Sequence, residues 1–203
     1  MNQVRTATAF AVVLGVAAAS ATAEDKTSEQ QEMSAEHKAM MEAWEKAAKP
    51  GPQHQWLAGK AGKWEFAGKF WMDPTKPPTE SVGTVERELM LGRRVLAEKV
   101  KSTYMDKPFE GYGLTGYDNV SKEFWGTWND NMGTGIMLST GQCDDKGACT
   151  HSSSYMDAMT NAKKTMRMTS REEGPDREVH QFFEKGPDGK EFKSMELTYT
   201  RGK

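Results

Sequence analysis

From Gly62 onward the chain is divided into segments of about ten residues, and clusters of Gly, Pro, Asn or Asp separate each segment from the next. This spacing is typical of strands joined by turns in an all-β barrel or sandwich. Helical periodicity does not return after this point. The pattern predicts ten strands, at Trp64–Met72, Val82–Leu91, Arg94–Thr103, Phe109–Tyr117, Glu123–Asp130, Gly133–Gly141, Cys149–Met156, Lys163–Arg171, Arg177–Lys185 and Glu191–Arg201.

Within several of these segments apolar and polar residues alternate, as they do on a strand with one face turned inward. In the first, Trp64, Phe66, Phe70 and Met72 share a face. Short turns between consecutive strands imply a meander, and a meander of this length can close and so remove its edge strands. We therefore expect a ten-stranded antiparallel meander barrel, calycin-like in architecture and preceded by one amphipathic α-helix.

The helix is predicted between Ser34, which is a suitable N-cap, and Lys49, with Pro50-Gly51-Pro52 ending it. Its apolar residues recur at helical spacing and are Met40, Met41, Trp44, Ala47 and Ala48. An apolar stripe of this kind is expected to pack on the barrel or to plug one of its ends. A mobile lid over a cavity is the alternative.

Residues 1–23 have the features of a secretory signal, with Arg5 at the start, an apolar run from Ala7 to Ala19 and small residues at the cleavage site. The run is shorter than the roughly 20 residues that cross a bilayer, so export is favoured over anchoring. The expected organisation is a signal peptide at 1–23, a polar lead-in and helix at 24–53, and a barrel domain at 54–203. The protein would then be periplasmic or extracellular, with no membrane span after signal removal.

Lys and Arg number 27 and Asp and Glu number 29, which gives a formal net charge of −2. Nucleic-acid binding requires a concentrated basic surface, and a balanced chain does not predict one. No polynucleotide partner is therefore expected. The oligomeric state is left open.

The chain has two cysteines, Cys143 and Cys149, on either side of a turn that contains Lys146-Gly147. In an exported protein this spacing predicts a disulfide at the mouth of a hairpin. The loop is short, so the disulfide would fix the hairpin rather than hold the fold together. Two free thiols are the alternative.

Two parts of the sequence resemble known families. Gly62-Lys63-Trp64 and the closing Thr198-Tyr199-Thr200-Arg201 resemble the lipocalin and calycin signature, in which a basic side chain covers the tryptophan at the barrel floor. This resemblance implies structural roles for Trp64 and Arg201. GYDNVSKEFWGTWNDNMGTG and EKGPDGKEFKSMELTYTR resemble an uncharacterised family of exported bacterial calycin-like barrels, from about His54 to Arg201. The resemblance to that family implies the fold and does not imply an activity.

If apolar and polar residues alternate along the predicted strands as described above, the inward residues would form one apolar interior. This interior would bind a small molecule, with Tyr112 and Glu196 as polar contacts. Its predicted apolar lining is Phe66, Phe70, Met72, Leu114, Trp128, Ile136, Leu138, Met166 and Met168. We expect non-covalent binding of a small, mainly apolar ligand. A fully packed barrel with a structural or protein-interaction role in the cell envelope is the alternative.

Catalytic and cofactor chemistry has little support in the sequence. Asp118 or Asp130 could act as a general acid or base, but both lie where turns begin, and backbone hydrogen bonds explain them there. No nucleophile arrangement is present, so no catalytic residue is assigned.

No metal site and no cofactor are assigned either, since the four histidines lack metal-ligand spacing. His151 with Met156, Met159, Met166 and Met168 would suit copper(I), although methionine also fills irregular cores. If its face points inward, His180 could be an axial haem ligand, as in the nitrobindin branch of ten-stranded barrels. The first strand, GKWEFAGK, lacks the glycine expected of that branch.

Overall fold

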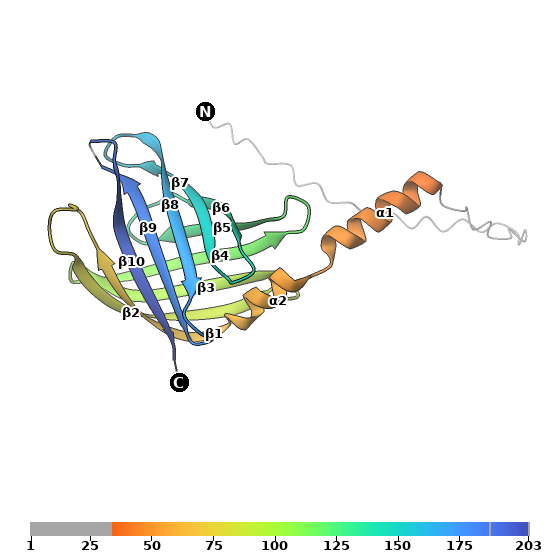
Figure 1. Ribbon diagram of the computed structural model, residues 1–203, viewed down its shortest axis with the longest axis horizontal. Helices are drawn as coiled ribbons and strands as arrows, with labels where there is room; N and C mark the ends of the chain where they lie inside the picture. The colour runs from red at the N-terminus through yellow and green to blue at the C-terminus, as the bar shows by residue number, and fades with distance from the viewer. Residues whose placement is uncertain (1–33, 187, 203) are drawn as a thin grey trace, which may run out of the picture.

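The computed structural model describes residues 34–186 and 188–202, and the predicted signal segment lies outside this range. Ten strands form a closed antiparallel barrel in the order β1-β10-β9-β8-β7-β6-β5-β4-β3-β2 (Figure 1). Two helices precede it, α1 (Ala35–Ala48) and α2 (Pro52–Gly59). The strands are β1 (Gly62–Phe70), β2 (Thr79–Met90), β3 (Val95–Tyr104), β4 (Lys107–Asp118), β5 (Glu123–Asp130), β6 (Met137–Cys143), β7 (Cys149–Asp157), β8 (Ala162–Glu172), β9 (Arg177–Lys185) and β10 (Glu191–Arg201).

This architecture confirms the predicted barrel and its meander. The barrel closes where β1 pairs with β10, with Trp64 opposite Arg201 and Phe70 opposite Met195. Asp118 Oδ1 accepts a hydrogen bond of 2.8 Å from the backbone N–H of Val120 at the turn after β4. Such local bonds satisfy the backbone where the ladder ends, and they let consecutive strands pair.

Two glycines in β4 lie under the tryptophans of β5. A Cβ atom on Gly111 would collide with the Trp128 ring, and one on Gly116 would collide with the Trp125 ring. Both glycines are directly opposite or diagonal to the tryptophan they contact in the β4–β5 register. The absence of a side chain therefore lets each indole lie flat against the neighbouring strand.

The helix predicted at residues 34–49 forms as α1, and Ser34 caps it by accepting a hydrogen bond from the backbone N–H of His37. Its predicted packing on the barrel is wrong. In the part of the chain that the structure describes, no residue of α1 is buried, and Trp44 is 63% exposed. Figure 1 shows the helix extending away from the barrel.

The reason lies at the C-terminal end of α1. Arg94 Nη2 donates to the carbonyl of Ala48 at 2.8 Å. Asn119 Nδ2 donates to the carbonyls of Ala47 and Lys49, also at 2.8 Å. These bonds satisfy carbonyls that a helix end leaves without partners. They hold the end of α1 at the rim of the barrel while its axis points outward.

The unpredicted helix α2 covers the barrel end instead. It begins at Pro52, a favoured first helical residue, and His54 Nδ1 accepts from the backbone N–H of Gly51 at 3.1 Å. His54 and Leu57 are buried, and Leu57 packs in a core cluster with Leu96 and Phe124. No helix among the described residues combines the length and the apolar character needed to cross a membrane.

Candidate ligand-binding cavity

The barrel encloses a cavity of about 380 Å³, which is within the usual size range for small-molecule sites. Aromatic side chains form much of its wall, among them Phe66, Phe70, Phe109, Trp128 and Phe182. The residues of α2 that border it, Trp56 and Leu57, lie at the covered end of the barrel. The interior is therefore a ligand-sized space with a largely apolar lining.

The structure brings together part of the predicted lining. Phe66, Phe70, Leu114, Trp128 and Met168 border the cavity. Met166 is buried but does not border it, and Met72, Ile136 and Leu138 are exposed by 83%, 49% and 51%. Tyr112 and Glu196 point to the outer face, where the Tyr112 hydroxyl contacts Met90 and Glu196 bonds to Gln181 and Lys193.

The predicted lining residues that lie outside the cavity do so for simple geometric reasons. Met72 lies beyond the end of β1, and Ile136 precedes β6, which begins at Met137 rather than at the predicted Gly133. Met137 is opposite Trp128 in the register, so Met137, not Leu138, shares the inward face. A shift of one residue moves every side chain of a strand to the other side.

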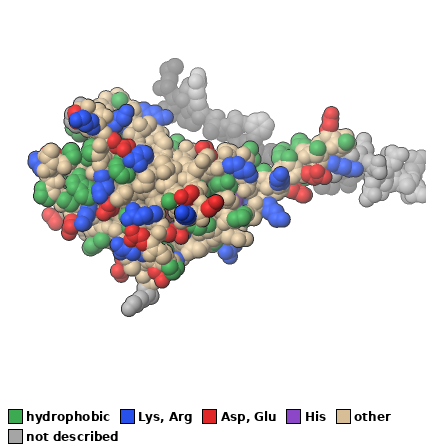
Figure 2. All heavy atoms as spheres, in the orientation of Figure 1, with side chains coloured by type: hydrophobic (Ala, Val, Ile, Leu, Met, Phe, Trp, Pro, Cys, Tyr) green, Lys and Arg blue, Asp and Glu red, His purple; other side chains and the backbone are tan. Residues whose placement is uncertain are grey.

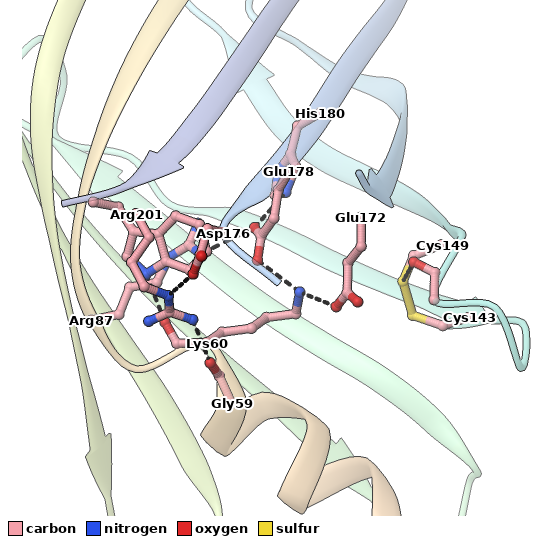
Figure 3. A network of polar contacts seen from close by, with 12 residues as sticks. Gly59, Lys60, Arg87, Cys143, Cys149, Glu172, Asp176, Glu178, His180 and Arg201 are labelled. Atoms are coloured by element: carbon pink, nitrogen blue, oxygen red, sulfur yellow. Dashed lines mark hydrogen bonds and ion pairs between the residues drawn. A yellow bond between two sulfur atoms is a disulfide. The ribbon is translucent and has the colours of Figure 1, made fainter. Parts of the chain in front are cut away.

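A group of paired charges lies at the covered end of the cavity, with Arg87 and Glu178 buried (Figure 3). Arg87 pairs with Glu98 at 2.6 Å and with Glu178 at 3.0 Å. Glu178 also pairs with Lys60 at 2.8 Å, and Lys60 in turn pairs with Glu172 at 2.8 Å. We call Lys60, Arg87, Glu98, Glu172 and Glu178 the charged cluster.

Mutual pairing keeps Arg87 and Glu178 ionised. Burial alone would raise the pKa of Glu178, but the hydrogen bond from His180 and the charges of Arg87 and Lys60 hold that pKa well below its ordinary value. Burial would lower the pKa of Arg87, yet Glu98 and Glu178 raise it overall. Buried charges are tolerated only when paired in this way.

Trp64 lies between two arginines at the same end. The Arg201 guanidinium carbon is 4.3 Å from the centre of the indole ring and that of Arg87 is 4.9 Å away. Arg201 also donates to the carbonyls of Gly59 and Ala61, which fixes the end of α2 to the closing strand (Figure 3). The basic side chain over Trp64 is thus present, and a second cation, Arg87, was not foreseen.

Two histidines border the cavity beside the charged cluster. His180 Nε2 lies 3.3 Å from Glu178 Oε2, and its ring centre is 4.8 Å from that of Tyr199. His151 has its Nδ1 buried without a hydrogen-bond partner among the described residues. The two histidines therefore differ, because one is engaged by a carboxylate and the other has an unsatisfied nitrogen.

The aspartates considered for catalysis serve local structure. Backbone hydrogen bonding from Val120 lowers the pKa of Asp118. Asp130 borders the cavity, where it accepts from Trp128 Nε1 at 2.9 Å and from the backbone N–H of Met132 at 2.9 Å. Neither carboxylate faces a nucleophile or base in these contacts.

The methionines considered for copper are dispersed. Met156 and Met159 are exposed, whereas Met166 and Met168 face the interior. Among residues 34–186 and 188–202, no three His, Cys, Asp or Glu side chains come together as a metal site.

Cys143 and Cys149 form the predicted disulfide and are directly opposite each other in the β6–β7 register. Asp144 Oδ1 accepts from the backbone N–H groups of Lys146 and Ala148 at 2.9 Å, which shapes the turn between the cysteines. Gly147 has a φ of 77° and lies near Trp56 of α2. The disulfide hairpin therefore adjoins the covered end of the barrel.

Residues 49–201 match a family described as protein of unknown function (DUF1579). The chain belongs to this family. The match covers the whole barrel and α2, and it confirms the resemblance to an uncharacterised family. It assigns no activity to the DUF1579 barrel.

One solved structure resembles the DUF1579 barrel in fold, and a second is matched at a lower score. Rv2717c from M. tuberculosis is 17% identical with a TM-score of 0.55, and the match covers 76% of this chain and all of that one. A redesigned β-barrel is 14% identical with a TM-score of 0.39, over 72% of this chain and 95% of the other. A comparison with curated proteins finds no match. At these identities the likeness extends to the fold alone.

Sequence reasoning missed the polar side of this DUF1579 cavity. Ser139, Ser153, His151, Ser170 and His180 occupy inward positions on β6 to β9 and border the cavity. From the sequence, His151 and His180 are interpreted only as possible metal or haem ligands, and the serines are not singled out. Ser139 and Ser153 are directly opposite each other, as are Ser170 and His180, and only the strand register reveals this pairing.

We expect His151 to make folding sensitive to mild acid. Burial and the nearby His180 lower its pKa to about 4, against about 6.5 in an unfolded chain. The unfolded state therefore binds the extra proton first, so stability is complete above pH 6.5 and falls as the pH decreases toward 4. The loss should be about 1 to 3 kcal/mol, and His151→Gln should remove it.

The measurement is the free energy of unfolding by urea at several pH values. His37→Gln, on exposed α1, is the matched control and should keep the wild-type slope. Parallel curves for the wild type and His151→Gln would contradict the prediction.

Proposed function

We propose that this DUF1579 barrel binds a small, mainly apolar molecule non-covalently inside its cavity. The observation that carries the proposal is the space of about 380 Å³ inside the barrel, with aromatic walls. A barrel with a purely structural role would fill this volume with side chains, because empty apolar space loses packing contacts. Binding is therefore favoured over the packed-barrel alternative.

Two features support export as the setting for this function. The disulfide between Cys143 and Cys149 is of a kind that persists in oxidising compartments. Residues 1–23 have the pattern of a secretory signal. We accordingly place the proposed binding in the periplasm or outside the cell.

The face of the barrel that Figure 2 shows gives little support to a binding role for nucleic acids. Figure 2 shows Lys and Arg intermixed with Asp and Glu over the visible face of the barrel. Polyanion binding depends on a surface of one sign. The interior remains the favoured site.

Haem binding is the cofactor alternative, and it needs an imidazole nitrogen available for the iron. His180 Nε2 already lies within hydrogen-bond distance of Glu178 and its ring packs on Tyr199. His180 is therefore not the available ligand that the haem alternative requires.

Met168→Trp is expected to weaken binding of a neutral fluorescent probe, N-phenyl-1-naphthylamine, by about tenfold or more, because the indole would occupy cavity space. Met159→Trp is the matched control, since Met159 lies in an exposed turn, and it should bind like the wild type. The measurement is the rise in probe fluorescence on titration with each protein. Equal weakening in both variants, or no binding by the wild type, would contradict the proposal.

Native mass spectrometry of protein purified from its own host provides an independent test. A co-purifying small molecule that is absent from Met168→Trp is expected. Ligand-free protein in repeated preparations would count against the proposed function.

A further inference from the structure

The cavity wall has two chemically different sides. The aromatic side includes Phe66, Phe70, Phe109 and Trp128, from β1, β4 and β5. The other side, on β6 to β9, carries the inward polar residues Ser139, Ser153, Ser170, His151 and His180 beside Met168 and Phe182, and we call the five polar residues the polar stripe. A purely apolar ligand would offer no hydrogen-bond partner to the serine hydroxyls or to His151 Nδ1, which is unfavourable.

The charges at the cavity are all engaged within the protein. Lys60 and Arg87 are the cations that border it among the described residues, and both are paired with carboxylates. The bordering carboxylates are Glu98, Glu178 and Asp130. Glu98 is held by Arg87, Glu178 by Arg87 and Lys60, and Asp130 by Trp128 Nε1.

A charged head group beside His151 would therefore find no available counter-ion, because Asp130, which neutral donors hold, lies at the opposite end of β5 from Phe124, the residue that contacts His151. An anion would meet Lys60 and Arg87, which carboxylates already neutralise, and also the carboxylate of Asp130. A cation would have to compete with Lys60 or Arg87 for Glu178. Moving an ion from water into such a site is costly unless a partner is free to receive it. The arrangement selects against both charges.

His151 supplies an uncharged hydrogen-bonding group in the same wall. Burial keeps its imidazole neutral near neutral pH, and its Nδ1 has no partner among the described residues. It packs across from Gly141, whose missing side chain leaves room for the ring. A neutral imidazole can donate through one nitrogen and accept through the other, which suits a hydroxyl or carbonyl group.

We propose that the ligand is an uncharged amphipathic molecule, with a hydroxyl or carbonyl group at His151 and the polar stripe and its hydrocarbon portion against the aromatic side. This inference rests on the proposed function, because it specifies the ligand class of the same cavity. A hydrogen bond between the neutral ligand group and the neutral His151 would give specificity without burying a charge.

The test compares three ligands of equal chain length, 1-decanol, decanoic acid and decylamine, as competitors of N-phenyl-1-naphthylamine at pH 7.5. Decanol should bind at least about tenfold more tightly than the ionised acid and amine, since these must bury an unpaired charge. His151→Phe keeps the ring volume and removes the hydrogen bond. It should weaken decanol binding by about five- to tenfold, calculated with the probe affinity that is measured directly for the same variant.

His151→Gln retains an uncharged donor and acceptor and should keep most of the decanol affinity. His37→Phe, on exposed α1, is the matched control and should have no effect. If His151→Phe does not fold, the ligand series on the wild-type protein and on His151→Gln still decides the matter.

The outcomes separate the two proposals. If the probe does not bind the wild type, the proposed function fails and this inference fails with it. If the probe binds but decanoic acid or decylamine competes as well as decanol, only the uncharged ligand class is overturned. Undiminished decanol binding to a folded His151→Phe would overturn the role of His151.

Discussion

Arg87→Met is expected to lower the free energy of unfolding by about 3 to 5 kcal/mol, the range found when one partner of a buried ion pair is removed. Arg87 is almost wholly buried, and it neutralises Glu98 and Glu178 from inside the barrel. Without it, Glu178 would retain Lys60 and His180, but Glu98 would lose the guanidinium that neutralises it. The measurement is urea-induced unfolding followed by circular dichroism at pH 7.5.

Arg167→Met is the matched control. Arg167 pairs with Glu191 on the surface, where both side chains are well exposed. An exposed pair contributes about 0 to 1 kcal/mol, so this variant should remain close to the wild type.

The double variant Arg87→Met with Glu98→Gln should recover part of the loss, because it removes a stranded carboxylate together with its partner. A loss below about 1 kcal/mol for Arg87→Met, equal to that of the control, would contradict a structural role for the charged cluster.

Trp64→Ala is expected to cost about 3 to 5 kcal/mol, as large truncations of buried aromatic residues do. Trp64 is 2% exposed, lies between Arg87 and Arg201, and donates from Nε1 to the carbonyl of Lys60 at 2.9 Å. The truncation would leave a void and would remove the surface on which both guanidinium groups pack. It would also loosen α2, since Lys60 follows directly after that helix.

Trp44→Ala provides the same substitution at an exposed site. Trp44 is on α1, clear of the barrel, so its loss should change the unfolding free energy by less than about 0.5 kcal/mol. The measurement is the urea concentration at the midpoint of unfolding, compared between variants whose unfolding free energies have the same dependence on urea concentration. Similar losses in the two variants would show that α1, too, packs against the barrel in solution.

The helices illustrate what periodicity can and cannot predict. Met40, Met41 and Trp44 recur at helical spacing, and α1 forms where this spacing predicted a helix. The same pattern suggested a buried face, which the structure does not have. Burial depends on the direction in which the helix leaves the barrel, and this is set by Arg94 and Asn119, which bond to its last carbonyls from distant turns.

The cavity residues show the same difference between what a local pattern predicts and what it does not. Phe66, Phe70 and Trp128 were assigned to the interior by alternation, and they border the cavity. Leu138 was misassigned because β6 has too few apolar residues to reveal its phase, and one position decides the face. The charged cluster joins Lys60, directly after α2, to residues of β2, β3, β8 and β9, and no local pattern could relate them.

The sequence by itself determined the closed ten-stranded barrel, the disulfide and the family, because these depend on local periodicity, turn chemistry and contiguous motifs. Tertiary structure alone decided which helix covers the barrel end, how Arg87 and Lys60 are neutralised, and that one side of the cavity is polar. Such features arise from contacts between residues as far apart as Lys60 and Glu178, whose proximity is fixed only when the strands close into a barrel.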